Sequence, residues 1–98
     1  MKNVTMEQLA RFENAQETLG MMVAIRTNWI TQERRRDNPD NEKIACWQSE
    51  RQEYEVMEDA LRLDNEAEIN RVLTTYNPQV RSAFEQPAEK EHYHAEAA

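Results

Sequence analysis

The chain has 98 residues and a formal net charge of −7, which leaves room for one domain with one modest hydrophobic core. A single Gly and three Pro are too few for a turn-rich all-β protein, whereas the many Glu, Gln, Arg, Ala and Leu residues favour helix. Because an acidic chain repels the phosphate backbone, the charge also disfavours general nucleic-acid binding.

The first helix is expected over residues 5–36. Thr5 and Gln8 have the spacing of a capping box, in which each side chain bonds the other residue's backbone N–H. No stop signal follows until the Asp-Asn-Pro run at 37–39. Gly20 costs helix stability inside this segment, and we interpret it as a place where another helix approaches closely.

An apolar belt covers residues 19–30 of this helix. At about 100° per residue, Leu19, Val23 and Ile30 form one stripe, and a second sector holds Met21, Met22, Ile25 and Trp29. A helix that is apolar on more than one side must be covered on more than one side. The rest of the chain or a second copy must supply the cover, and we expect a homodimer through this helix rather than a monomer.

The second helix is expected over residues 39–63, with Asn38 as its N-cap and Pro39 at its first position. Its apolar stripe holds Trp47, Tyr54 and Leu61, each seven residues from the next. The connection to the first helix is short, so the two helices should lie side by side and antiparallel.

Folding this hairpin about Asn38 pairs particular positions of the two helices. Ile30 should meet Trp47, and Arg26 should face Glu50 at the seam. An unpaired buried charge would cost several kcal/mol, so we expect an ion pair between Arg26 and Glu50 that helps set the register.

Two further short segments should cover the hairpin. Asn65 is a candidate N-cap for a helix over 66–76, whose apolar stripe holds Ile69, Val72, Leu73 and Tyr76. We expect it to form a lid over the belt at Met22, Ile25 and Trp29. Asn77-Pro78 predicts a separate helix over 78–85. Because no linker separates the helices expected over 39–63 and 66–76, these two could instead form one continuous helix.

Residues 86–98 are polar and have no apolar stripe, so they should form a disordered tail. The predicted fold is therefore all-α, in a single domain over 1–85. A long antiparallel hairpin (5–36 and 39–63) is capped by one or two short helices (66–76 and 78–85).

The expected location is cytoplasmic. Cys46 is the single cysteine and cannot form an internal disulfide, which suits a reducing compartment. The first apolar run follows a mixed, partly acidic start, and Arg26 interrupts it well before the roughly 20 residues that a membrane span needs.

Catalysis and metal binding have little support in the residues. His92 and His94, the two histidines, lie in the expected tail, away from Cys46, and one Gly cannot build a phosphate loop. The oxygen-rich segment 37–42 lacks the Gly and the bidentate Glu of a calcium loop. We expect neither an enzyme nor a bound cofactor or metal.

Protein binding is the favoured function. The belt residues Met21, Met22, Ile25 and Trp29 would provide an apolar anchor, and Glu53, Glu55 and Asp59 an acidic face that attracts a basic partner. In size and composition the chain resembles the short, acidic, helical proteins of phages and plasmids, many of which occupy a surface of a host protein. That resemblance implies an inhibitor or adaptor.

Two alternatives remain at the level of sequence. Arg34, Arg35 and Arg36 could contact nucleic acid from the ends of paired helices in a dimer. Their place at a helix C-terminus, where the helix dipole favours cations, explains them without a ligand. The other alternative is a structural or assembly subunit.

Overall fold

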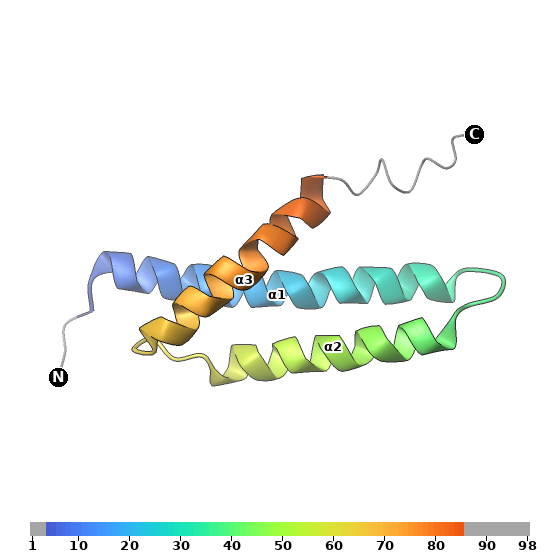
Figure 1. Cartoon of the computed structure of the whole chain (residues 1–98), viewed down its shortest axis with the longest axis horizontal. Helices are drawn as coiled ribbons and strands as arrows, with labels where there is room; N and C mark the ends of the chain where they lie inside the picture. The colour runs from blue at the N-terminus through green and yellow to red at the C-terminus, as the bar shows by residue number, and fades with distance from the viewer. Residues whose placement is uncertain (1–3, 86–98) are drawn as a thin grey trace.

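The computed structural model describes residues 4–85, which form three helices: α1 (Met6–Arg34), α2 (Asn41–Ala60) and α3 (Glu66–Glu85). α1 and α2 lie side by side as a long antiparallel hairpin, and α3 crosses α1 obliquely (Figure 1). The predicted all-α hairpin with a shorter covering element is confirmed. The tail expected over 86–98 lies outside the described residues. Within the described part of the chain, no helix is long and apolar enough to cross a membrane.

The start of α1 is the predicted capping box. Thr5 Oγ1 accepts the backbone N–H of Gln8 at 3.0 Å, and Gln8 Oε1 accepts the backbone N–H of Thr5, also at 3.0 Å. These bonds satisfy donors that the first helical turn leaves unpaired. α1 ends at Arg34, two residues before the predicted end, with Arg35 as its C-cap.

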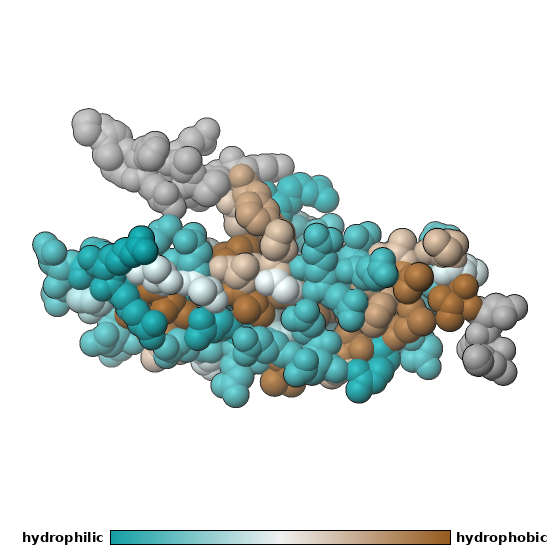
Figure 2. Space-filling view, turned by 180° about the vertical axis from the view of Figure 1, so that it is seen from behind, coloured by the Kyte–Doolittle hydropathy of each residue, from teal (hydrophilic) through white to brown (hydrophobic). Residues whose placement is uncertain are grey.

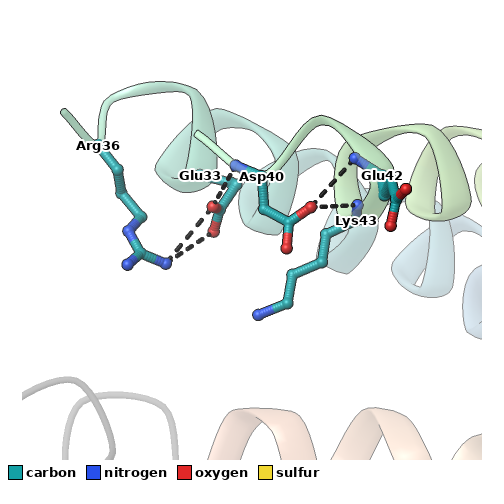
Figure 3. A network of polar contacts seen from close by, with 5 residues as sticks. All are labelled: Glu33, Arg36, Asp40, Glu42 and Lys43. Carbon is teal, nitrogen blue, oxygen red and sulfur yellow. Dashed lines mark hydrogen bonds and ion pairs between the residues drawn. The ribbon is translucent and has the colours of Figure 1, made fainter. Parts of the chain in front are cut away.

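The connection between α1 and α2 is organised by Glu33 and Asp40 (Figure 3). The side chain of Glu33 is buried, and its carboxylate accepts the backbone N–H of Asp40 at 2.8 Å and a bond from Arg36 at 3.3 Å. Asp40 in turn accepts the backbone N–H groups of Glu42 and Lys43, so it caps α2.

The predicted start of α2 was therefore wrong by two residues. Asn38 is not the N-cap, and Pro39 lies before the helix. The reason is a contact across the connection: Glu33, in the last turn of α1, accepts the backbone N–H of Asp40, and Asp40 rather than Asn38 is thereby placed at the first turn of α2.

The hairpin has the predicted register. Arg26 Nε lies 2.8 Å from Glu50 Oε1, the rings of Trp29 and Trp47 are 5.5 Å apart, and Arg51 donates to Thr27 at 3.1 Å. Gly20 was expected to mark a tight helix contact. A Cβ placed there would meet only Glu58 Oε2, at 3.8 Å, which is an ordinary contact distance, so this expectation was wrong.

The main core lies where α3 crosses the hairpin. Its buried residues come from all three helices and the α2–α3 connection: Ala15, Leu19, Met22, Ile25, Tyr54, Leu61, Ile69, Val72 and Val80. The ring of Tyr76 on α3 meets that of Tyr54 on α2 edge to face at 5.4 Å. The apolar belt of α1 is thus covered from two sides, by α2 and by α3.

The third and fourth predicted helices are one helix. Asn65 caps α3 as expected, accepting the backbone N–H of Glu68 at 3.1 Å, and α2 and α3 are separate helices. Pro78, however, lies inside α3 and does not begin a new helix. Pro removes one helical hydrogen bond. α3 nevertheless continues as one helix, and its buried residues extend past Pro78 to Val80.

α3 covers less of the belt than predicted. Met22 and Ile25 are buried at 0% and 8% exposure, but Trp29 is 37% exposed. α3 crosses α1 obliquely (Figure 1), and the core that it forms with α1 includes Met22 and Ile25 but not Trp29. The expected lid over Trp29 is therefore absent among the described helices.

Candidate protein-binding site

On one side of the hairpin, the two long helices carry an apolar stripe that α3 covers only in part. On α1, Met22, Ile25 and Trp29 are spaced to share one side of the helix, and on α2, Tyr54 and Trp47 do the same. α3 covers the part near Met22 and Tyr54, both of which belong to the core. We call the uncovered part the tryptophan face. It is formed by Trp29, Trp47, Glu50 and Cys46, together with Arg26, which is buried beneath them.

The side chains of the tryptophan face are locked to one another. The two indole rings are tilted by 54°, and the guanidinium carbon of Arg26 lies 4.6 Å from the centroid of Trp29 and 5.2 Å from that of Tyr54. Arg26 also donates to Glu50 at 2.8 Å and to the Tyr54 hydroxyl at 3.3 Å. A partner would therefore meet aromatic groups that are already ordered, which lowers the entropic cost of binding.

The electrostatics of this face do not activate a nucleophile. Cys46 is exposed and lies 3.6 Å from Glu50 Oε2, and the negative charge of Glu50 raises the pKa of the Cys46 thiol. Burial raises the pKa of Tyr54. Both groups are held in the neutral form at neutral pH, whereas nucleophilic chemistry needs the thiolate.

The four residues predicted as an apolar anchor divide into two groups. Met22 and Ile25 belong to the core, so a partner cannot reach them unless α3 moves. Met21 is half-buried and Trp29 is exposed. Sequence reasoning missed Trp47 as an anchor because it assigned that side chain to the core, opposite Ile30.

The three predicted carboxylates are exposed but do not share one side of α2. Glu55 and Asp59 are four residues apart and lie on the same flank. Glu53 precedes Glu55 by two residues, or about 200° of rotation, and lies on the flank of the tryptophan face with Glu50. Of the three, Glu53 is placed to act together with Trp29.

Arg34, Arg35 and Arg36 are all exposed at the tip of the hairpin. Arg34 is in the last turn of α1 and Arg35 is its C-cap, as the helix dipole favours. Arg36 is paired with the buried carboxylate of Glu33, so part of this basic run organises the turn. Contact with nucleic acid stays a prediction.

Other places in the described structure offer less. A cleft between the N-terminal parts of α1 and α3 is bridged by a bond from Gln8 to Glu66 at 2.6 Å and one from Arg11 to Asn70 at 3.2 Å. Its polar groups already bond one another. Within residues 4–85, no three His, Cys, Asp or Glu side chains gather as a metal site would require; His92 and His94 lie outside the described residues.

Comparison with known proteins adds no relative: no protein-family model, curated protein or solved structure matches this chain. The tryptophan face is thus the feature from which a function must be inferred. It combines Trp, Tyr and Arg, which are the residue types that most often dominate binding energy in protein interfaces.

Proposed function

We propose that this protein is a non-catalytic binding factor, an inhibitor or adaptor that attaches to another protein through the tryptophan face and blocks that protein's surface. The observation that supports this most directly is the exposure of Trp29, which continues the stripe of the buried residues Met22 and Ile25. Covering Trp29 and the half-buried Trp47 would remove aromatic surface from water, which is the main favourable term in protein association.

The charge beside the tryptophan face favours a basic partner. Glu50 keeps 38% of its side chain exposed despite its pair with Arg26, and Glu53 is exposed on the same flank. Residues 37–63 carry a net charge of −5, the most acidic part of the chain. The electric field of these carboxylates speeds the approach of a basic protein, and added salt weakens it.

The role of inhibitor or adaptor is the one implied by the resemblance in size and composition to small phage and plasmid proteins. A cytoplasmic location is part of the same proposal and rests on the single cysteine. Neither the nucleic-acid alternative nor the assembly-subunit alternative gains support from a particular contact in the described residues.

The test is affinity capture from the native host with three forms of the protein: wild type, Trp29→Ala and Val56→Ala. Val56 is 59% exposed on the far side of α2 and serves as the matched control. A partner held by wild type and Val56→Ala, but lost by Trp29→Ala, is the expected result. If all three forms retain the same proteins equally, the tryptophan face is not the binding site.

The steering part of the proposal has its own test on the captured partner. Glu53→Arg should slow association, and the effect should shrink as salt rises, because exposed charges are screened over about 10 Å at 0.1 M salt. Glu55→Arg makes the same charge change on the opposite flank and should have the smaller effect. Equal association rates for all three proteins would overturn the role of Glu53.

A further inference from the structure

A second cleft lies between α1 and the C-terminal half of α3, and it shares no residue with the tryptophan face. The end of α3 and the helix α2 lie on opposite sides of α1, and this end stands clear of the hairpin in both views (Figure 1; Figure 2). The cleft has a volume of about 230 Å³. Two helices supply its lining: Asn14, Glu17, Thr18 and Met21 from α1, and Asn77 and Val80 from α3.

The hydroxyl group of Thr18 is buried in the wall of this cleft without a hydrogen-bond partner. Thr18 is 5% exposed, and its Oγ1 bonds no other residue in the part of the chain that the structure describes. A threonine inside a helix often donates its hydroxyl to a carbonyl one turn earlier, as Thr74 does to Asn70 at 2.9 Å. A buried polar group without a partner destabilises a fold. Its position in the wall of a cleft therefore points to a bound molecule as the partner.

Glu17 gives the cleft a negative charge, and no basic residue lines it. No basic residue among those described, Arg81 on the adjoining turn of α3 included, lies at ion-pair distance from Glu17. The side-chain amides of Asn14 and Asn77 likewise bond no other residue within 4–85. The cleft therefore offers hydrogen-bond acceptors from a carboxylate, two amides and a hydroxyl around one negative charge.

We propose that this cleft binds a primary ammonium group at the end of a short hydrocarbon chain. An ammonium group has three N–H donors and a positive charge, so it can bond the Glu17 carboxylate, the Thr18 hydroxyl and an amide oxygen together. Met21 and Val80 supply apolar surface for the hydrocarbon chain. Liquid water occupies about 30 Å³ per molecule, so the cleft holds a ligand of roughly eight non-hydrogen atoms.

Other small ligands match this lining less well. An anion would meet Glu17 without a basic residue to hold it. A neutral alcohol would bond Thr18 but would leave the charge of the carboxylate without a counterpart. A bare metal ion would gain nothing from Met21 and Val80, and within residues 4–85 no three metal-binding side chains gather to coordinate it.

The cleft acts independently of the tryptophan face, because the two sites have no residue in common. Met21, which was predicted as part of the apolar anchor, lines this cleft and not the tryptophan face. Trp29→Ala, which should abolish partner capture, should therefore leave amine binding unchanged. Failure of one site does not decide the other.

The test is an NMR titration of the isotope-labelled full chain with n-butylammonium chloride at constant ionic strength. The backbone amide signals of the lining residues should shift and reach saturation. Butyrate and n-butanol are the matched ligands, since they present a negative charge or no charge on a similar hydrocarbon chain. Neither of them should produce a saturating shift.

Two charge variants identify the carboxylate that binds. Glu17→Gln should raise the dissociation constant for n-butylammonium at least about tenfold, because it removes the charge and keeps the shape of the side chain. Glu13→Gln makes the same change one turn earlier on α1, outside the cleft, and should leave the constant unchanged. Both positions are exposed, so the circular dichroism of each variant should match that of wild type.

Thr18→Val replaces the hydroxyl with a methyl group of similar size and should have two effects. Binding of n-butylammonium should weaken, because one acceptor is lost. The urea midpoint of the protein without amine should rise, because the buried hydroxyl without a partner is gone. A lower midpoint would show that the hydroxyl is already bonded within the protein, which would overturn its role in binding.

Primary ammonium groups occur both on free alkylamines and on lysine side chains. Nα-acetyl-lysine methylamide carries the same butyl chain on a blocked backbone, so it separates the two sources. Weaker binding than n-butylammonium would assign the cleft to a free amine, and equal or tighter binding would assign it to a lysine of another protein.

Three results would overturn the inference. The first is the absence of a saturating shift with n-butylammonium. The second is an equal response to n-butanol, which would show that only the apolar wall binds. The third is the same dissociation constant for wild type and Glu17→Gln.

Discussion

Arg26 and Glu50 join the two long helices at the point where α3 no longer covers them. The Nε–Oε1 distance is 2.8 Å, and the Arg26 side chain is 11% exposed against 38% for Glu50. Arg26 also stacks on Trp29 and Tyr54, so one side chain ties the register of the hairpin to the arrangement of the tryptophan face.

Arg26→Ala should lower the free energy of unfolding by about 2 kcal/mol, measured by urea denaturation. The change removes the stacking and leaves the Tyr54 hydroxyl and Glu50 without this donor, but the partial exposure of Glu50 limits the loss. Arg34→Ala, at an exposed position of the same helix, should change stability by less than about 0.5 kcal/mol. Equal effects of the two substitutions would show that Arg26 contributes nothing beyond an ordinary surface arginine.

Glu33 should make the free energy of unfolding depend on pH in the acid range. The backbone N–H of Asp40, and then Arg36, holds the pKa of the Glu33 carboxyl below its usual 4.5. Because the folded pKa is the lower one, the stabilisation is complete above the unfolded value and is lost as pH falls through the folded value.

Glu33→Gln is the variant that reveals this dependence, with the thermal midpoint measured from neutral pH into acid. The variant should melt below wild type at pH 7. The difference should begin to shrink as the pH falls below 4.5, and it should be lost once the pH is below the lowered pKa of Glu33 in the folded wild type. Parallel curves across the whole range would contradict the role assigned to the ionised carboxylate.

Gly20→Ala should stabilise the protein by about 1 kcal/mol in chemical denaturation. A Cβ at this position meets only Glu58 Oε2 at 3.8 Å, so the substitution removes the helix cost of Gly without a clash. Ala24→Gly, at an exposed position one turn later, should cost a similar amount. Destabilisation by Gly20→Ala would mean that α1 and α2 approach more closely than the structure shows.

Glu50→Gln should make Cys46 more reactive. The charge of Glu50 is the main cause of the raised pKa of the thiol, so its removal lowers that pKa and increases the thiolate fraction near pH 8. Alkylation by iodoacetamide should be faster in this variant, and the two rates should converge at high pH. Glu55→Gln serves as the control, and a pH–rate profile identical to wild type in both variants would exclude Glu50 as the cause.

Much of this fold could be predicted from residues that are close together in the sequence. The capping box of Thr5 and Gln8 needs only residues in one turn, and the spacing of Trp47, Tyr54 and Leu61 was enough to find the face of α2. The short connection then required antiparallel helices and brought Arg26 to Glu50. Each of these features depends on neighbours along one helix or on the length of one turn.

The features that the spacing of residues could not predict depend on contacts between different helices. Asp40 rather than Asn38 caps α2 because Glu33 holds its backbone, and α3 continues through Pro78, with Val80 beyond it buried in the core. The exposure of Trp29 follows from the angle at which α3 crosses α1. Periodicity shows which side of a helix is apolar, but the crossing angle comes from the packing of side chains on both helices, and it determines how far along that side the cover extends.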